Sequence, residues 1–243
     1  GAEVNMTTVL YIGLANVADS LYALQQRVFR EHAVSFAEVI DALDANYAGH
    51  EALRQLLRSV PKYGNDDAAA DAMAARVADH FKEMLGRFRN PRGFALRPAF
   101  YSWHRQTYEG GNLGATPDGR LAGMPLSHGG NPMHGMARQG ITALVNSMTR
   151  IRYDDTAGCP MHIHLHATNA QQRPEAIAAL LRAAFRLGAP HVILNVIDSQ
   201  TLRRAMEHPE EYADLTIRVT GYSARFVHLQ RCYQEEIAAR NEF

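Results

Sequence analysis

The sequence predicts an α/β fold, because helical patterns fill its first third and strands alternate with helices in its last third. Hydrophobic residues make up 47% of the 243 residues and charged residues 21%, which is enough apolar material for a buried core. Basic and acidic residues both number 25, so the charge balance gives no reason to expect nucleic acid or an anionic membrane as a partner. Two cysteines in a chain of this length are no disulfide framework and favour a reducing cytoplasm.

The first third is predicted to be helical, with helices over residues 6–34, 36–43, 50–57 and 68–85. Ser35 and Glu38 form the capping box of the second helix, and Asp66 and Asp67 cap the alanine-rich fourth. Two apolar stripes follow from the spacing, one through Leu10, Leu14, Val17, Leu21, Leu24 and Val28, the other through Met73, Val77, Phe81 and Leu85. No strands nearby cover these broad faces, so we expect an N-terminal partner that is missing from this chain or lies on another.

The middle of the chain, residues 89–132, is dense in glycine, proline and aromatic residues and predicts long loops. Its aromatic cluster at 100–104 is expected either to pack in the core or to shape a pocket. Strands are predicted over 161–165, 191–196 and 215–219, and helices over 174–187, 201–207 and 226–240. This alternation is what favours an α/β region.

The segment LTIRVTGYSARFVHL, residues 215–229, resembles the glycyl-radical signature of the pyruvate formate-lyase and glycerol/diol dehydratase superfamily. Further blocks occur in the family's order, namely ADSL at 18–21, KYGNDD at 62–67, ATPDGR at 115–120, PLS at 125–127, the residues Asn195, Thr201 and Tyr212, and the ending Gln234, Ile237 and Arg240. One such motif alone is weak evidence, whereas several in order are strong.

This resemblance implies that Gly221 holds a backbone radical. A radical at Cα is delocalised over the neighbouring amide and carbonyl and needs a flat carbon, which a Cβ would crowd. An activase that uses S-adenosylmethionine and an iron–sulfur cluster would install the radical, so the chain itself is expected to bind no cofactor and no metal. Arg218, Tyr222 and Ser223 flank the glycine, and we expect them to support the loop by packing and hydrogen bonding.

The fold that the resemblance implies is the C-terminal half of a ten-stranded glycyl-radical-enzyme barrel with surrounding helices. Residues 1–110 would be the helical part of the barrel domain and residues 111–243 the glycine radical domain. Full-length members imply a homodimer in the cytoplasm, which includes bacterial microcompartments.

The family also requires a cysteine that becomes a thiyl radical and usually heads a Cys-x-Glu motif, which this sequence lacks. Cys159 is followed by Pro160, and Cys232 lies beyond the radical glycine, so both are expected to be small apolar residues of the interior. The chain is then inactive alone. It is a fragment of a longer enzyme, a natural radical-bearing subunit that assembles with a cysteine-bearing chain, or a spare part that replaces an oxygen-cleaved terminus.

The branch of the superfamily is left open by the motifs. GYSA at 221–224 and GNDD at 64–67 look like the dehydratase and lyase branch, whereas Arg225 and Phe226 lean toward pyruvate formate-lyase, a formate C-acetyltransferase. A non-catalytic repair or docking module is a second function class. An unrelated α/β protein with chance matches is a third possibility, and it predicts a self-contained core without a large exposed apolar face.

Three alternating histidines, His162, His164 and His166, share one face of a predicted strand, an arrangement that permits a metal site. No carboxylate or cysteine accompanies them at ligand spacing. The pattern therefore favours polar lining or surface histidines over metal ligands.

Overall fold

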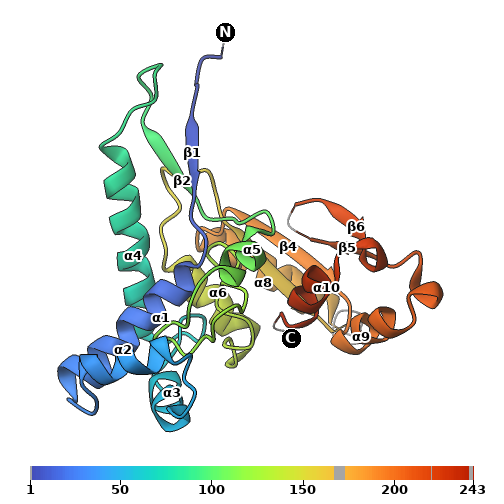
Figure 1. Cartoon of the computed structure of the whole chain (residues 1–243). Coiled ribbons are helices and arrows are strands. Elements are labelled where there is room, and N and C mark those ends of the chain that lie inside the picture. The colour runs from blue at the N-terminus through green and yellow to red at the C-terminus, as the bar shows by residue number, and fades with distance from the viewer. Residues whose placement is uncertain (1, 167–172, 220, 241–242) are drawn as a thin grey trace.

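The computed structural model describes residues 2–166, 173–219, 221–240 and 243 (Figure 1). Within these residues the strands form three two-stranded sheets. The two parallel pairs are β1 (Thr7–Leu10) with β2 (Leu96–Ala99) and β3 (Pro160–Leu165) with β4 (His191–Val196), and the antiparallel pair is β5 (Thr216–Arg218) with β6 (Ser223–Arg225). The mixture of helices and strands agrees with the predicted α/β class, while the ten-stranded barrel stays a prediction.

Most of the helices lie where the sequence predicts them, and the last strand and helices gather on the opposite side of the molecule from α1–α4 (Figure 1). Their bounds are α1 Leu14–Leu24, η1 Gln25–Arg30, α2 Phe36–Asp44, α3 Glu51–Arg58, α4 Ala68–Gly86, α5 Arg105–Gly111, α6 Gly140–Thr149, α8 Pro174–Arg186, α9 Ser199–Glu207, η2 Pro209–Tyr212, η3 Phe226–His228 and α10 Arg231–Ala238. The capping predictions are confirmed at Ser35, whose capping box is complete, and at Asp67, whose carboxylate accepts from the N–H groups of Ala69 and Ala70. The prediction for Asp66 is wrong, because its carboxylate accepts from the Asn146 side chain instead.

The single helix predicted over residues 6–34 is wrong at both ends. The β-branched run from Thr7 to Val9 pairs with β2, so Leu10 belongs to a strand rather than to the helical stripe. Gly13, with φ +79°, then turns the chain into α1. Beyond Leu24 the helix widens into the π-helical segment η1.

The loop prediction for residues 89–132 is wrong in two places, because β2 and α5 lie inside this segment. Strand β2 contains Pro98, which the two-stranded sheet tolerates because β2 is an edge strand. Helix α6 was not predicted at all. The strand after Gly221 was also missed, since the chain forms a β5–β6 hairpin before the last helix rather than turning directly from strand to helix.

Three separate clusters of buried apolar side chains hold the molecule together. The largest packs β3, α1, α4 and α6 around Phe100 and Ile163, and the second packs α1, α2 and α3. The third contains Leu202, Ala205, Ile217, Val219, Phe226 and Ile237. We call residues 198–219 and 221–240, which surround this third cluster, the C-terminal unit. It therefore has an apolar core of its own. The predicted domain boundary at residue 110 stays a prediction.

An open apolar groove of about 1470 Å³ runs between α1 and α4. Its lining includes much of the two predicted apolar stripes, Val17, Leu21 and Leu24 from α1 and Val77, Phe81 and Leu85 from α4. The helices bury their alanines instead, among them Ala18, Ala74 and Ala78. In the part of the chain that the structure describes, no helix is both long and apolar enough to cross a membrane.

Candidate functional site

Gly221 lies at the turn of the β5–β6 hairpin, and its backbone is exposed. The N–H of Val219 donates to the carbonyl oxygen of Tyr222 at 2.9 Å, which closes the turn. Gly221 has φ +116°, in the left-handed region where a side chain is strained. Its two chain neighbours aside, no atom of the described residues lies within 4 Å of the position that a Cβ would take. The fold therefore requires glycine for its backbone conformation and leaves the Cα accessible.

The strand that leads to Gly221 is held by side chains from two other elements. Asn195 of β4 accepts from the N–H of Arg218 at 2.9 Å and donates to its carbonyl oxygen at 2.7 Å. Arg240, just beyond α10, donates to the carbonyl oxygen of Val219 at 3.2 Å. The backbone just before Val219 and at Val219 itself is thus fixed by three hydrogen bonds.

The flanking residues predicted to support the loop do make contacts in it. The Arg218 guanidinium donates to Ser223 Oγ across the hairpin at 3.4 Å. Tyr222 Oη shares a hydrogen bond with His104 Nε2, and the two rings pack edge to face. His104 belongs to the aromatic cluster of the middle segment, and it and Trp103 both have positive φ, an uncommon conformation for such residues.

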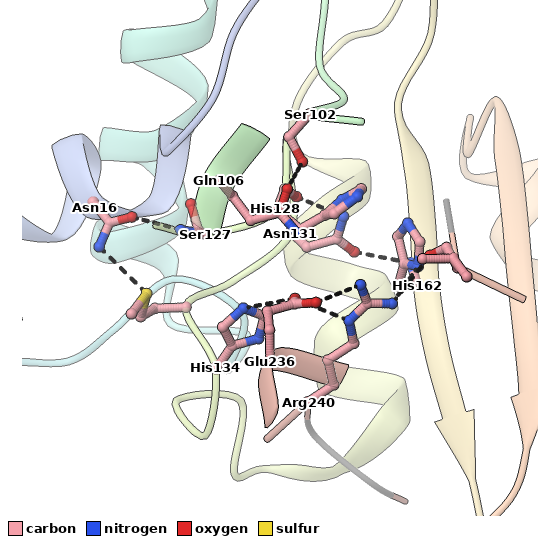
Figure 2. A network of polar contacts seen from close by, with 12 residues as sticks. Asn16, Ser102, Gln106, Ser127, His128, Asn131, His134, His162, Glu236 and Arg240 are labelled. Atoms are coloured by element: carbon pink, nitrogen blue, oxygen red, sulfur yellow. Dashed lines mark hydrogen bonds and ion pairs between the residues drawn. The ribbon is translucent and has the colours of Figure 1, made fainter. Parts of the chain in front are cut away.

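A buried ion pair lies behind the hairpin, and Figure 2 shows it with its neighbours. Both Arg240 and Glu236 are buried, and the guanidinium reaches the carboxylate through Nε at 3.1 Å and NH2 at 2.9 Å. His134 Nε2 lies 3.1 Å from Glu236 Oε1. Burial opposes ionisation of Glu236, but the Arg240 charge and the His134 contact outweigh it and hold the pKa of Glu236 well below its usual range. The pair is therefore ionised.

Histidines line a small cavity of about 30 Å³ next to this pair, where His128, His134, His162 and His164 meet Arg240. Figure 2 shows three of them, His128, His134 and His162. The rings of His128 and His162 lie 4.2 Å apart, centroid to centroid. Burial lowers the pKa of His128 to about 3 and that of His164 to about 3, with the Arg240 charge acting in the same direction. His128 and His164 are accordingly neutral at pH 7.

The predicted pattern of alternating histidines holds for His162 and His164, whose side chains line the same cavity, while His166 is exposed. Among the described residues, only His208, Glu210 and Glu211 bring three possible ligand atoms close together, and all three are exposed. His162 and His164 thus line a cavity, as their interpretation as lining residues predicts.

The blocks that carry the family resemblance meet in space. Asp19 accepts from the N–H of Tyr63 at 2.9 Å, which joins ADSL to KYGNDD. Asn16, just before ADSL, donates to Asp118 Oδ2 and accepts from the N–H of Ser127, both at 2.7 Å, so that it ties the two later blocks to α1. Figure 2 shows the contact between Asn16 and Ser127. These buried polar contacts fix the loops on which the blocks lie.

The two cysteines differ sharply in their surroundings. Cys159 is 1% exposed, and burial raises the pKa of its thiol to about 12. Cys232 is exposed on α10. The expectation of an interior residue therefore holds for Cys159 and is wrong for Cys232, which lies on the solvent side of its helix.

Sequence reasoning missed the roles of Asn195, His134, Glu236 and His104, and it treated Arg240 only as part of a family ending. A signal was available for one pair, because Glu236 and Arg240 are four residues apart on a helix and carry opposite charges. The contacts of Asn195 and His104 join segments far apart in the chain, and no local pattern indicates them.

Comparison with known proteins gives matches over most of the chain. Residues 1–110 match the family described as Pyruvate formate lyase-like, and residues 126–227 match the one described as Glycine radical. The chain is 33% identical over 246 residues to trans-4-hydroxy-L-proline dehydratase of Clostridioides difficile, covering 100% of this chain and 31% of that protein. It is 32% identical over 235 residues to isethionate sulfite-lyase of Bilophila wadsworthia, covering 95% of this chain and 28% of that protein.

A solved glycyl radical enzyme from Archaeoglobus fulgidus superposes with a TM-score of 0.93 at 36% identity, over 99% of this chain and 31% of that one. The chain thus spans less than a third of the length of the curated relatives it matches. The chance-match alternative is wrong, since the structure has a large exposed apolar groove and the likeness extends from end to end. This chain, with its hairpin glycine and both family matches, belongs to the glycyl radical enzymes.

Proposed function

We propose that Gly221 stores a backbone radical for a lyase or dehydratase reaction. The observation that carries the proposal is an exposed glycine, in a left-handed conformation, at a turn whose approach strand is fixed by Asn195 and Arg240. Its relatives include a dehydratase and a sulfite-lyase, which favours that branch over formate C-acetyltransferase.

In the proposed reaction, the Gly221 radical takes a hydrogen atom from a cysteine thiol, which becomes a thiyl radical while Gly221 regains its Cα–H bond. The thiyl takes a hydrogen atom from the substrate, and the product radical takes it back. A partner activase with S-adenosylmethionine and an iron–sulfur cluster would first remove the Gly221 hydrogen, so this chain needs no cofactor of its own.

The thiyl cysteine is proposed to lie outside this sequence. Cys159 is buried against Gly130, whose added Cβ would lie 2.6 Å from its sulfur, and none of its hydrogen bonds reaches the hairpin. Cys232 lies on the exposed side of α10. We therefore propose that this chain does not turn over substrate alone.

The α1–α4 groove is the surface that the cysteine-bearing part would cover. Its lining is rich in apolar side chains that a monomer rarely leaves open, such as Leu21 and Met84. The parallel pairs β1–β2 and β3–β4 would then be pieces of a larger barrel that the two parts complete. A homodimer of the complete enzyme in the cytoplasm remains part of this proposal.

Anaerobic activation tests the radical. The chain, together with a cysteine-bearing part and an activase, should give a doublet in electron paramagnetic resonance, and exposure to air should cut the backbone at residue 221. Gly221→Ala should abolish the doublet. Gly188→Ala is the matched control, because Gly188 also has a positive φ, +102°, and open space around it. A doublet that survives in Gly221→Ala would overturn the proposal.

A second candidate is a radical-bearing subunit or spare part that docks on a cysteine-bearing chain. The separate core of the C-terminal unit favours it, because that unit is packed around its own apolar residues. One experiment distinguishes this candidate from a piece of one enzyme. The chain is added to a glycyl radical enzyme that has already been cleaved at its own glycine, and turnover is measured. Restored turnover supports the spare part, and none supports a piece of one enzyme.

A further inference from the structure

Polar side chains connect the C-terminal unit to the rest of the chain, and several of them contact one buried ion pair, Arg240 with Glu236. We call this contact region the seam. We propose that Arg240 and Glu236 are positioning residues that fix the backbone on which Gly221 lies, and that His134 aligns this pair with the rest of the molecule. The proposal rests on the radical function of Gly221 and adds to it the side chains that set where the glycine stands.

The contact to the hairpin is direct. Arg240 NH1 donates to the carbonyl oxygen of Val219, two residues before Gly221. The same nitrogen lies 3.5 Å from His162 Nδ1 on β3. One guanidinium thus touches both the radical hairpin and a strand of the main body (Figure 2).

Arg240 can occupy this place only with a counter-charge. It is 7% exposed, and the imidazole rings around it offer no negative charge. Glu236 supplies that charge from the same helical face, through two hydrogen bonds that also fix the plane of the guanidinium. A guanidinium held in this way points at Val219 in one orientation.

His134 joins the pair to the main body. It comes from the segment between α5 and α6 and lies 3.1 Å from Glu236 Oε1, on the carboxylate that holds Arg240. Displacement of the pair would therefore move the hairpin relative to the main body. We infer that these three residues set the position of Gly221 rather than merely stabilise α10.

The chain offers a matched control on the same helix. Arg231 and Glu235 also pair at i and i+4, at 3.0 Å, but both side chains are more than half exposed. Arg231 reaches the carbonyl oxygen of Met206, away from the hairpin. Glu235→Gln thus makes the same chemical change as Glu236→Gln one residue away. It affects Arg231, which does not contact Val219, rather than Arg240, which does.

Hydrogen–deuterium exchange of the whole chain, read by mass spectrometry, tests the positioning. Arg240→Met and Glu236→Gln should speed exchange of the amides in residues 216–225 about tenfold, the value for one lost charged hydrogen bond, while α4 keeps its protection. Arg240→Lys keeps the charge and one donor, so its hairpin exchange should lie between wild type and Arg240→Met. Glu235→Gln should match wild type throughout.

Wild-type exchange of the hairpin in a folded Arg240→Met or Glu236→Gln variant overturns the proposal. If both variants exchange faster throughout the chain, they are unfolded, and the exchange of Arg240→Lys is then the test of the proposal. Faster hairpin exchange with a protected α4 supports positioning, and unchanged hairpin exchange refutes it.

Electron paramagnetic resonance separates this proposal from the one on which it rests. After activation, Arg240→Met and Glu236→Gln should show a several-fold smaller doublet than Glu235→Gln. No doublet in the wild type refutes the radical function and leaves the exchange result standing. Doublets of wild-type size in all variants would show that the contacts of Arg240 and Glu236 do not matter for formation of the Gly221 radical.

Discussion

At the scale of single residues, Gly221 meets two separate demands. Its φ of +116° suits glycine alone, and the proposed radical also needs a carbon without a side chain. Because both demands fall on one residue, loss of the doublet in Gly221→Ala could follow from backbone strain. The strain and the radical must therefore be measured independently.

The backbone strain that Gly221→Ala introduces is predicted to be modest. Gly221→Ala should lower the free energy of unfolding by about 1–2 kcal/mol, the cost of a left-handed conformation for a residue with a Cβ, since the added methyl meets open space. Gly188→Ala, with φ +102° and the same open surroundings, should lose a similar amount. Gly86→Ala, within α4, should be neutral or stabilising. Urea unfolding of the three variants checks this. A loss at Gly221 several times that at Gly188 would contradict it.

The two thiols should differ in reactivity by at least about a hundredfold. Burial raises the pKa of Cys159 to about 12, whereas Cys232 is exposed. One cysteine per chain should react quickly with iodoacetamide in the native protein, and two in denaturant. Cys232→Ser should remove the fast reaction. Fast labelling of Cys159 in the native chain would show that its pocket opens readily.

At the scale of elements, the hairpin depends on the histidine-lined seam that packs β3 against the last helix. Three of its histidines, His128, His162 and His164, are unprotonated because burial lowers their pKa. Acid should therefore act on this seam.

Stability should fall as the pH drops from about 6.5 toward 3. A histidine whose folded pKa is about 3 stays neutral in the native state, while the unfolded chain takes up a proton near pH 6.5, so acid favours unfolding. His164→Asn removes one such group, so between pH 4 and 6 it should reduce the slope of the unfolding free energy against pH by at most about 1.4 kcal/mol per pH unit.

Two aspartates act in the opposite direction. Burial raises the pKa of Asp19 to about 7 and that of Asp71 to about 6, so both hold protons in the folded state that the unfolded chain releases. Comparing His164→Asn with its parent cancels this contribution. Urea unfolding at pH 4, 5 and 6 gives both slopes, and equal slopes would show that His164 is not buried in the neutral form.

Elements with local signals were predictable, and elements made by distant pairing were not. The Ser35 capping box and the Asp67 cap lie within a few residues of the helices they start, and both helices are where the sequence places them. Strand β1 exists because β2, almost 90 residues later, pairs with it, and apolar spacing alone indicated a helix.

The candidate site also has a part with a local sequence signal and a part that depends on contacts between distant segments. Gly221 and its neighbours were found because they lie in one contiguous motif. Asn195 and His104 reach the hairpin from positions 23 and 118 residues away from their partners. Only the fold brings them together, so sequence reasoning could single out Gly221 but not the side chains that hold its hairpin.

At the scale of the whole molecule, the open apolar groove between α1 and α4 is the observation behind the proposed docking of a cysteine-bearing part. The buried sides of these helices are rich in alanines, with Leu14 and Tyr22 of α1 among them, while Leu21 and Met84 line the open groove. The predicted stripe of the first helix is therefore only partly buried by this chain: Leu14 and Val28 are buried, whereas Val17 and Leu21 are exposed.

The groove should make the isolated chain associate and bind apolar probes. Leu21→Glu places a charge on a side chain that is 45% exposed in the groove, so it should leave the fold intact while weakening self-association and binding to a cysteine-bearing part by roughly tenfold or more. Phe185→Glu is the control, because Phe185 is 54% exposed on α8 and does not line the groove. Sedimentation over a range of concentrations and titration of an environment-sensitive dye measure both effects. Equal weakening by the two variants would mean that association reflects general surface hydrophobicity, and no weakening by Leu21→Glu would remove the groove as the docking surface.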